Sequence, residues 1–215
     1  MVMIHPDAPT GWPSAIAPPF GFTFVGSIPN PLFTAKACAA NASLLSMTSK
    51  SPIDRPVFQK DGSVTAGNAS GINDGAAAIV LATATAADKS GLKPRARVLG
   101  YAHAGVRPEV MGIGPIPAVE NLMAKTGLSI SDFDVIESNE AFAAQALAVN
   151  KGLGIDPTKV NPNGGAIALG HPVGATGCII TIKALYELER IGGGKGLITM
   201  CIGGGQGIAI AIETL

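Results

Sequence analysis

The sequence predicts an α/β fold in which helices cover a mixed β-sheet. From about residue 95 to the C-terminus, strand and helix patterns alternate, as they do in layered α/β domains. The last two apolar runs are close enough in sequence to pair antiparallel. The composition agrees with a well-buried globular protein, because 47% of the 215 residues are hydrophobic, 14% are charged and 28 are glycines.

The elements of this domain follow from apolar periodicity and from helix start and stop signals. Pro115 opens a helix that Gly127 ends, and Gly152 and Gly154 end the next helix. Strands are expected at 97–103, 133–138, 197–202 and 207–212, and helices at 115–125, 140–151 and 174–190. The last helix is expected to bury a face formed by Ile179, Ile182, Leu185 and Leu188.

The first fifty residues differ in composition from the rest. Seven of the sixteen prolines lie between Pro6 and Pro31, so residues 1 to about 34 are predicted to be irregular, with a short helical piece over 34–47. The chain is therefore expected to comprise three parts: a Pro- and Phe-rich leader over 1–50, a segment over 51–94 and an α/β domain over 95–215.

Net charge, apolar run length and cysteine spacing indicate which partners and which location to expect. Fifteen basic and fifteen acidic residues cancel, so no net field attracts nucleic acid or an anionic membrane. Apolar stretches such as 76–81 are too short to span a bilayer. Three widely spaced cysteines indicate free thiols in a reducing compartment, and no basic residue precedes Lys36. We therefore expect a cytoplasmic location, with an organellar one left open.

Two glycine-rich motifs contain residues suited to chemistry. Cys201 ends an apolar strand and is followed by glycines at 203–205, whose N–H groups can approach an oxyanion. The alternative is a buried structural cysteine beside a hairpin. His171 lies among glycines before a helix, where Pro172 is expected in the first turn. The positive end of that helix would keep His171 neutral, as a base or a donor, and the alternative is a capping or core histidine.

Two further segments are compatible with ligand binding. Asn139 is predicted at the carboxyl end of a strand, the edge where ligands of open α/β sheets gather. The alternative is an N-cap for the helix expected from Glu140. The stretch 65–75 is rich in small residues and includes Ser70, which suits contact with an extended ligand or, equally, a loop that packs under a helix. No metal-ligand spacing is present in the sequence.

Together these segments closely resemble thiolases of the acetyl-CoA acetyltransferase type. Stretches 139–143, 164–177 and 201–205 match the family's three C-terminal signatures in order and spacing, and the match continues through 67–71 and 111–115. It covers about three quarters of the chain. The resemblance implies the C-terminal half of a thiolase-like layered fold, with residues 51 to 94 as a remnant of the loop region and of the first half.

The resemblance also implies roles for individual residues. His171 is similar to the histidine that activates the nucleophilic cysteine and helps bind the thioester oxygen. Cys201 is similar to the cysteine that moves protons to and from the attacking carbon or the CoA thiol, and a depressed thiol pKa would suit it. Asn139 resembles the holder of an oxyanion-hole water, and the Gly203 N–H resembles part of the second oxyanion hole. The residues that resemble substrate contacts are Ser70 at the pantetheine arm, and Met111 and Phe142 in the acyl pocket.

The activity that the resemblance implies is acyl transfer between acyl-CoA molecules, run as condensation of acetyl-CoA or as thiolysis of 3-ketoacyl-CoA in fatty acid or ketone metabolism. Coenzyme A thioesters would be substrates, with no permanently bound cofactor or metal. Acyl-CoA and a second copy of the chain are the expected partners, without nucleic acid or membrane.

The chain departs from the family in one respect. Thiolases carry their acyl-accepting cysteine in the N-terminal half, and Cys38, the sole candidate here, lies in surroundings unlike that segment. We therefore expect an impaired enzyme, and the alternative is a non-catalytic CoA-binding or interaction protein that retains a half-thiolase fold. A ketoacyl synthase is disfavoured, because those synthases have a second histidine where Cys201 stands.

Overall fold

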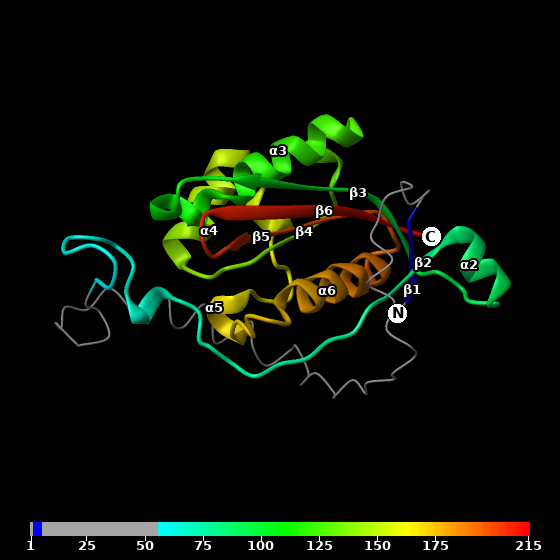
Figure 1. The fold of residues 1–215 in the computed structure, drawn as a ribbon, viewed down its shortest axis with the longest axis horizontal. Coiled ribbons are helices and arrows are strands. Elements are labelled where there is room, and N and C mark those ends of the chain that lie inside the picture. The colour runs from blue at the N-terminus through cyan, green and yellow to red at the C-terminus, as the bar shows by residue number, and fades with distance from the viewer. Residues whose placement is uncertain (1, 6–55) are drawn as a thin grey trace.

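The computed structural model describes residues 2–5 and 56–215, which form a six-stranded sheet between helices (Figure 1). In chain order the strands are β1 (Val2–His5), β2 (Val80–Thr83), β3 (Ala96–Gly105), β4 (Val135–Ser138), β5 (Lys195–Ile202) and β6 (Gln206–Thr214). The α-helices are α2 (Ala84–Lys89), α3 (Pro115–Thr126), α4 (Ala143–Leu153), α5 (Ala166–Leu169) and α6 (Thr176–Arg190). The predicted α/β class is confirmed.

The sheet is mixed, as the sequence predicts, and its strand order is β2-β1-β3-β6-β5-β4. β6 pairs antiparallel with both β3 and β5, whereas β4 runs parallel to β5. The parallel pair brings the carboxyl ends of β4 and β5 to the same edge of the sheet. That edge carries the candidate site.

The prediction of an irregular leader is wrong for its first residues. Val2–His5 form β1, which lies between β2 and β3 and pairs parallel with both. The strand ends before Pro6, so no proline interrupts its ladder, and Met3 is buried in the core. The predicted helical piece over 34–47 and the rest of the leader lie outside the described residues.

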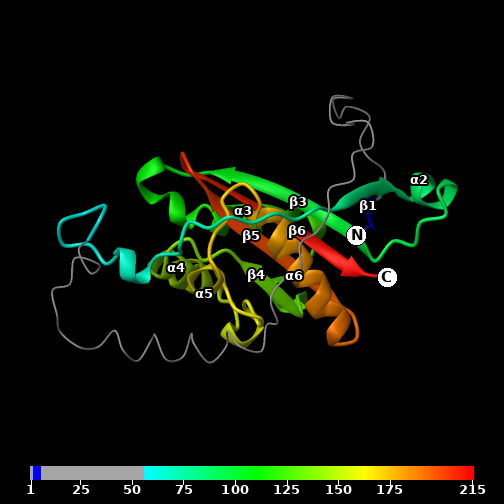
Figure 2. The same cartoon turned by 90° about the horizontal axis from the view of Figure 1, so that it is seen from below.

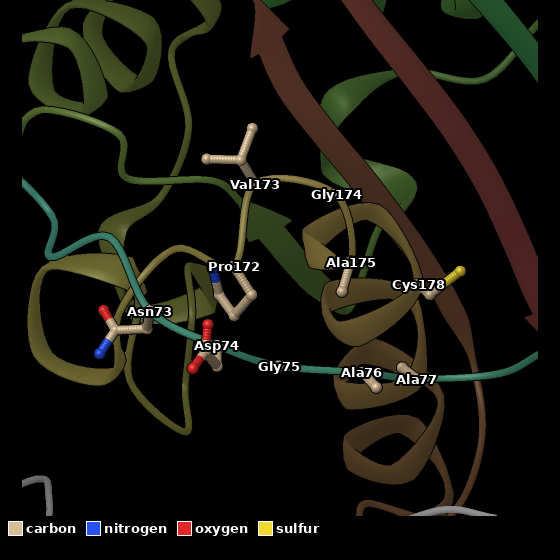
Figure 3. Close-up of a pocket in the computed structure, with 10 residues that line it drawn as sticks. All are labelled: Asn73, Asp74, Gly75, Ala76, Ala77, Pro172, Val173, Gly174, Ala175 and Cys178. Carbon is tan, nitrogen blue, oxygen red and sulfur yellow. The ribbon is translucent and has the colours of Figure 1, made fainter.

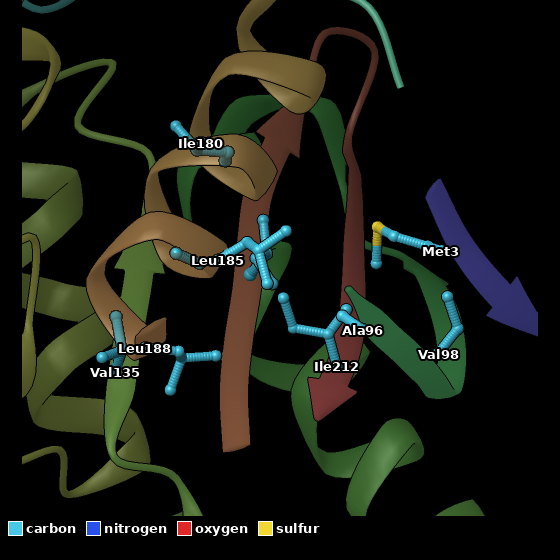
Figure 4. Packing of buried hydrophobic residues seen from close by; sticks show 10 residues of the cluster. Met3, Ala96, Val98, Val135, Ile180, Leu185, Leu188 and Ile212 are labelled. Carbon is cyan, nitrogen blue, oxygen red and sulfur yellow. The ribbon is translucent and has the colours of Figure 1, made fainter. Parts of the chain in front are cut away.

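Helices cover both faces of the sheet, and strand alternation divides the core accordingly (Figures 1 and 2). Ile198 of β5 faces α6, whereas Leu197 faces α3. The α6 side buries Ile180, Ala184, Leu185 and Leu188 against Met3, Ala96, Val98, Val135 and Ile212 (Figure 4). The α3 side buries Ala118, Val119 and Leu122 against Phe133, Ile136, Ile155, Ala209 and Ala211.

Helix ends and faces differ in part from the predictions. α3 ends as expected at Gly127, which has a left-handed φ of 72°. α4 and α6 start later than predicted, at Ala143 and Thr176. Ile179 and Ile182 are only half-buried, because the apolar face toward the sheet passes through Ile180 instead.

An extended segment over 69–79 runs along the outer side of α6 and leads into β2 (Figures 1 and 2). Its Gly75 lies against Pro172 and Ile179, and there is no room for a Cβ beside the proline ring. This segment therefore holds the start of α6 from the outside. None of the described helices combines the length and apolar character needed to cross a bilayer.

Candidate functional site

Asn139 lies at the carboxyl end of β4, as predicted. Its N–H donates to the carbonyl of Thr199 at 3.0 Å, so it continues the β4–β5 ladder by one residue, and it is 2% exposed. The alternative of an N-cap is wrong, because α4 begins at Ala143 with Phe142 as its cap residue. Asn139 is therefore a buried amide at the sheet edge.

His171 is held in one tautomer by its neighbours. Its Nε2 lies 3.3 Å from Asn139 Nδ2, and its Nδ1 lies 2.7 Å from Thr176 Oγ1. The Thr176 hydroxyl donates its hydrogen to the carbonyl of Pro172 at 2.8 Å, so it accepts from Nδ1–H. The lone pair is then on Nε2, where it accepts from the Asn139 amide. The arrangement presents Nε2 as the basic atom of the site.

The neutral state of His171 has a different cause from the one expected. Pro172 is not in the first turn of α6, which begins at Thr176, so His171 is not at the end of the helix dipole. Burial, by desolvating the imidazolium, lowers the pKa of His171 below its usual value. The imidazole is therefore neutral at pH 7.

Cys201 lies near the end of β5, two residues beyond the carbonyl to which Asn139 donates. It is 6% exposed, and burial raises the pKa of its thiol. The depressed pKa expected for a thiolate base is therefore wrong for this structure. A protonated thiol is suited to give a proton to a carbanion, and it becomes a base only at higher pH.

The turn after Cys201 depends on its glycines. Gly204 and Gly205 have φ values of 88° and 92°, which other residues rarely adopt. A Cβ on Gly205 would overlap the carbonyl of Val106, whose N–H donates to the Gly205 carbonyl at 2.7 Å. Gly203 is exposed, with open space where a Cβ would be. A ligand therefore has room to reach the backbone there.

The structure brings Ser70 and Phe142 together. The N–H and hydroxyl of Ser70 both donate to the carbonyl of Ala141 at 3.0 Å, and Ala69 bridges to Phe142. In the same segment the Gly71 carbonyl accepts from the His171 N–H at 2.8 Å. The stretch 69–71 is thereby joined to the segment 139–143 and to the loop that contains His171.

Met111 lies within the 3₁₀ helix η4 (Pro108–Ile113). The next residue, Gly112, packs so closely on Gln145 of α4 that a Cβ would meet its side chain. η4 therefore fixes Met111 relative to α4, the helix that follows Phe142.

Sequence reasoning missed the polar residues that support the site. Asn161 exchanges hydrogen bonds with the backbone of Ser138 and donates to Glu140 Oε1 at 2.9 Å. Glu140 Oε2 accepts from the N–H of Ile167, and a Cβ on Gly165 would overlap the Glu140 carboxylate. These contacts tie the loop before His171 to the segment after β4. The only sequence signal was the glycine pair at 164–165.

A buried ion pair lies behind the site and was also missed. Lys183 of α6 donates to Glu137 Oε2 at 2.9 Å and to the carbonyl of Gly164. The Glu137 side chain is 1% exposed, and burial raises its pKa to about 7, against the opposing effect of Lys183. A charged residue inside the apolar strand 135–138 was the available signal.

The raised pKa of Glu137 predicts a pH dependence of stability. The native state holds a proton that the unfolded state releases between pH 4.5 and about 7, so the free energy of unfolding falls as pH rises through that window. Glu137→Gln removes this titration. Relative to the variant, the wild type is expected to lose up to about 3 kcal/mol between pH 4.5 and 7.5, measured by urea unfolding.

The matched control is Glu213→Gln. Arg97 lowers the pKa of Glu213, so this acid contributes stability that is lost as pH falls, the opposite sign. Equal slopes for the wild type and Glu137→Gln would contradict the argument.

Two hollows lie near these residues. A groove of about 360 Å³ is lined by residues 73–77, residues 172–175 and Cys178 (Figure 3). A smaller cavity of about 30 Å³ lies behind Asn139 and includes Glu137 and Lys183. Among the described residues no group of three or more potential metal ligands is present. Cys38, the candidate nucleophile, lies outside the described residues.

Comparison with known proteins places this geometry in one family. Residues 92–214 match the model described as "Thiolase, C-terminal domain", and residues 46–85 match "Thiolase, N-terminal domain". The chain is 62% identical over 162 residues to beta-ketothiolase BktB of Cupriavidus necator, an alignment that covers 75% of this chain and 41% of the relative. It is 58% identical over 159 residues to an acetyl-CoA acetyltransferase of Chromobacterium violaceum, covering 74% and 41%.

Solved structures agree. An acetyl-CoA acetyltransferase of Bacillus anthracis aligns with a TM-score of 0.69 and 50% identity, over 75% of this chain and 41% of the other. Human mitochondrial 3-ketoacyl-CoA thiolase in complex with CoA aligns with a TM-score of 0.68 and 47% identity, over 74% and 41%. The chain thus spans about 41% of the length of these relatives.

Proposed function

Because the chain belongs to the thiolase family, we propose that it supplies the acid–base and oxyanion-binding half of an acyl-CoA acyltransferase site. The observation that carries this proposal is the neutral His171, whose Nε2 faces the buried Asn139 amide at the sheet edge. The reaction would be condensation of acetyl-CoA or thiolysis of a 3-ketoacyl-CoA, with coenzyme A thioesters as substrates and no permanently bound cofactor.

The proposed steps use the chemistry of three side chains. Claisen chemistry forms a carbanion next to the thioester carbonyl, and the negative charge passes to the carbonyl oxygen. Asn139, directly or through a water, donates to that oxygen, and His171 donates to it once its Nε2 has taken the proton of the acyl-accepting thiol. Cys201 transfers a proton: its thiol protonates the carbanion during thiolysis, and its thiolate removes the proton during condensation.

Further residues would position the substrate. The Gly203 N–H, in an open part of the turn, would form part of a second oxyanion hole and donate to the thioester oxygen bound there. Ser70 would contact the pantetheine arm, and Met111 and Phe142 would line the acyl pocket. The complex of human mitochondrial 3-ketoacyl-CoA thiolase with CoA supports a coenzyme A ligand. The unpaired thiols at Cys178 and Cys201 fit a reducing compartment such as the cytoplasm.

The test is exchange of the acetyl protons of acetyl-CoA in D₂O, followed by NMR. This partial reaction needs the oxyanion donors and the proton carrier but no acyl-accepting cysteine. Asn139→Ala is expected to slow protein-dependent exchange by about 100-fold or more, because it removes an oxyanion donor. His171→Ala is expected to slow exchange less, because the imidazole is neutral at pH 7 and donates only in its protonated form. His103→Ala, an exposed histidine on β3, is the control and should leave exchange unchanged.

A non-catalytic CoA-binding role remains the second candidate, favoured by the raised pKa of Cys201. The same experiment separates the two. Binding of CoA without protein-dependent exchange in the wild type would contradict the enzymatic proposal and support a binding protein.

We also propose self-association of the chain. β2 is an edge strand of the described sheet, and Val80 and Leu81 on it are 50% and 59% exposed, with Ile72 upstream 92% exposed. Exposed apolar residues on an open strand edge favour pairing with a second copy. Leu81→Lys together with Val80→Lys is expected to lower the sedimenting mass at micromolar concentration. A wild type that sediments as a monomer would contradict this prediction.

A further inference from the structure

The small cavity behind Asn139 contains two buried oxygens that accept no hydrogen bond from the described residues. These atoms are Glu137 Oε1 and Asn139 Oδ1, and their residues are 1% and 2% exposed. Both residues line the cavity, together with Thr176, Ile180 and Lys183 from α6. Buried oxygens of this kind usually have a donor, because leaving them bare is costly.

The two oxygens belong to the same side of the sheet. Glu137 and Asn139 are two residues apart in a continuous ladder with β5, so their side chains point to the same face. That face is the α6 side, because Lys183 bonds to Glu137 and His171, in the loop before α6, bonds to Asn139. The cavity therefore lies between the Glu137–Lys183 ion pair and the hydrogen-bonded pair of Asn139 and His171.

The chemistry of the cavity selects its occupant. When Glu137 is ionised, both oxygens are acceptors, so the occupant must supply two hydrogens, and the volume of about 30 Å³ suits one water. An anion is excluded by the Glu137 carboxylate, and a metal cation by the adjacent ammonium of Lys183. We propose that this cavity binds one ordered water, which donates to Glu137 Oε1 and Asn139 Oδ1 and so makes Glu137 a positioning residue for the Asn139 amide.

The bound water fixes which end of the amide faces the histidine. With Oδ1 accepting from the water, Nδ2 is directed at His171 Nε2, where it favours the neutral imidazole. If the amide turned, Oδ1 would accept from a protonated Nε2 and favour the imidazolium. The water site stands on geometry alone, whereas its importance for turnover rests on the proposed function.

A direct test is a high-resolution crystal structure of the full chain. We expect one water peak within hydrogen-bond distance of both Glu137 Oε1 and Asn139 Oδ1. A cavity without that peak, or a carboxylate bonded directly to the amide, would overturn the proposal.

A solution test measures the pKa of His171 by NMR in the 15N-labelled full chain, with His171→Gln to assign the signal among three histidines. In Glu137→Met/Lys183→Met both charges and the water's acceptor are removed, so the released amide can turn and the His171 pKa is expected to rise by about one unit. Glu137→Gln keeps a polar partner for the water and should hold the pKa near its wild-type value.

The size of the shift, compared with a single variant, distinguishes positioning from charge. Charged neighbours of Glu137 are Lys183, Glu140 and Glu187. Loss of the Glu137 charge alone would lower the His171 pKa and loss of the Lys183 charge alone would raise it, so a turned amide is indicated only by a rise larger than that in Lys183→Met, which keeps the water's acceptor. The control Glu187→Gln removes an acid that bonds to Asn163 and Arg190 instead. A His171 pKa in the double variant no higher than that in Lys183→Met would refute Glu137 as a positioning residue. If the wild type does not exchange the acetyl-CoA protons but the double variant shows the expected rise in the His171 pKa, the proposed function is refuted and the water site stands.

Discussion

The 215-residue chain alone is expected to thiolyse acetoacetyl-CoA at least about 10³-fold more slowly than the full-length beta-ketothiolase of Cupriavidus necator. Thiolases pass the acyl group through a cysteine nucleophile, and removing a nucleophile costs a covalent enzyme most of its rate. The described residues contain two thiols, Cys178 and Cys201, and neither belongs to the N-terminal nucleophile segment. The proposed half-site would therefore polarise a thioester, and none of the described residues is a candidate to receive the acyl group.

The measurement is the loss of acetoacetyl-CoA absorbance at saturating CoA, with both proteins at equal active concentration. Turnover within tenfold of the relative, abolished by Cys38→Ala, would overturn the expectation and identify Cys38 as the nucleophile. Turnover at that level without dependence on Cys38 would show that a different acceptor operates.

Local sequence signals predicted most of the architecture. Each strand and helix expected after residue 95 is present, because apolar periodicity and the glycines and prolines at the ends of elements act within a few residues of the chain. Gly127, for example, ends α3 through its own left-handed conformation. The elements missed were those stabilised by distant partners. β1 is four residues long, and only its pairing with β2 and β3 defines it as a strand.

The site was predicted at the level of motifs and not at the level of contacts. Asn139 and His171 are 32 residues apart in sequence, yet they meet because β4 and the loop before α6 end at the same edge. The pairing of Glu137 with Lys183, 46 residues away, has no local signature. Likewise, burial raises the pKa of the Cys201 thiol. That burial depends on the packing around the paired strands β5 and β6, which is a tertiary property.

The two described thiols provide the sharpest test of the proposed proton transfer. Cys201→Ser is expected to reduce acetyl-CoA proton exchange by about 100-fold or more, because general acid–base catalysis of this kind contributes about 10²–10⁴-fold and a serine hydroxyl is a much weaker acid. Cys178→Ser is the matched control. Cys178 lies in the first turn of α6 beside the 360 Å³ groove (Figure 3). Its substitution by serine should leave exchange unchanged.

The pH profile of the same exchange tests the role of burial. Because burial raises the pKa of Cys201, only a small fraction of the thiol is ionised at neutral pH, and that fraction grows about tenfold per pH unit below the pKa. Exchange by the wild type is therefore expected to rise steadily from pH 7 to 9, and Cys178→Ser should follow the same line. A rate that is constant across this range, or that reaches its plateau near pH 7, would mean that the base is already ionised there, and Cys201 with its raised pKa would not be that base.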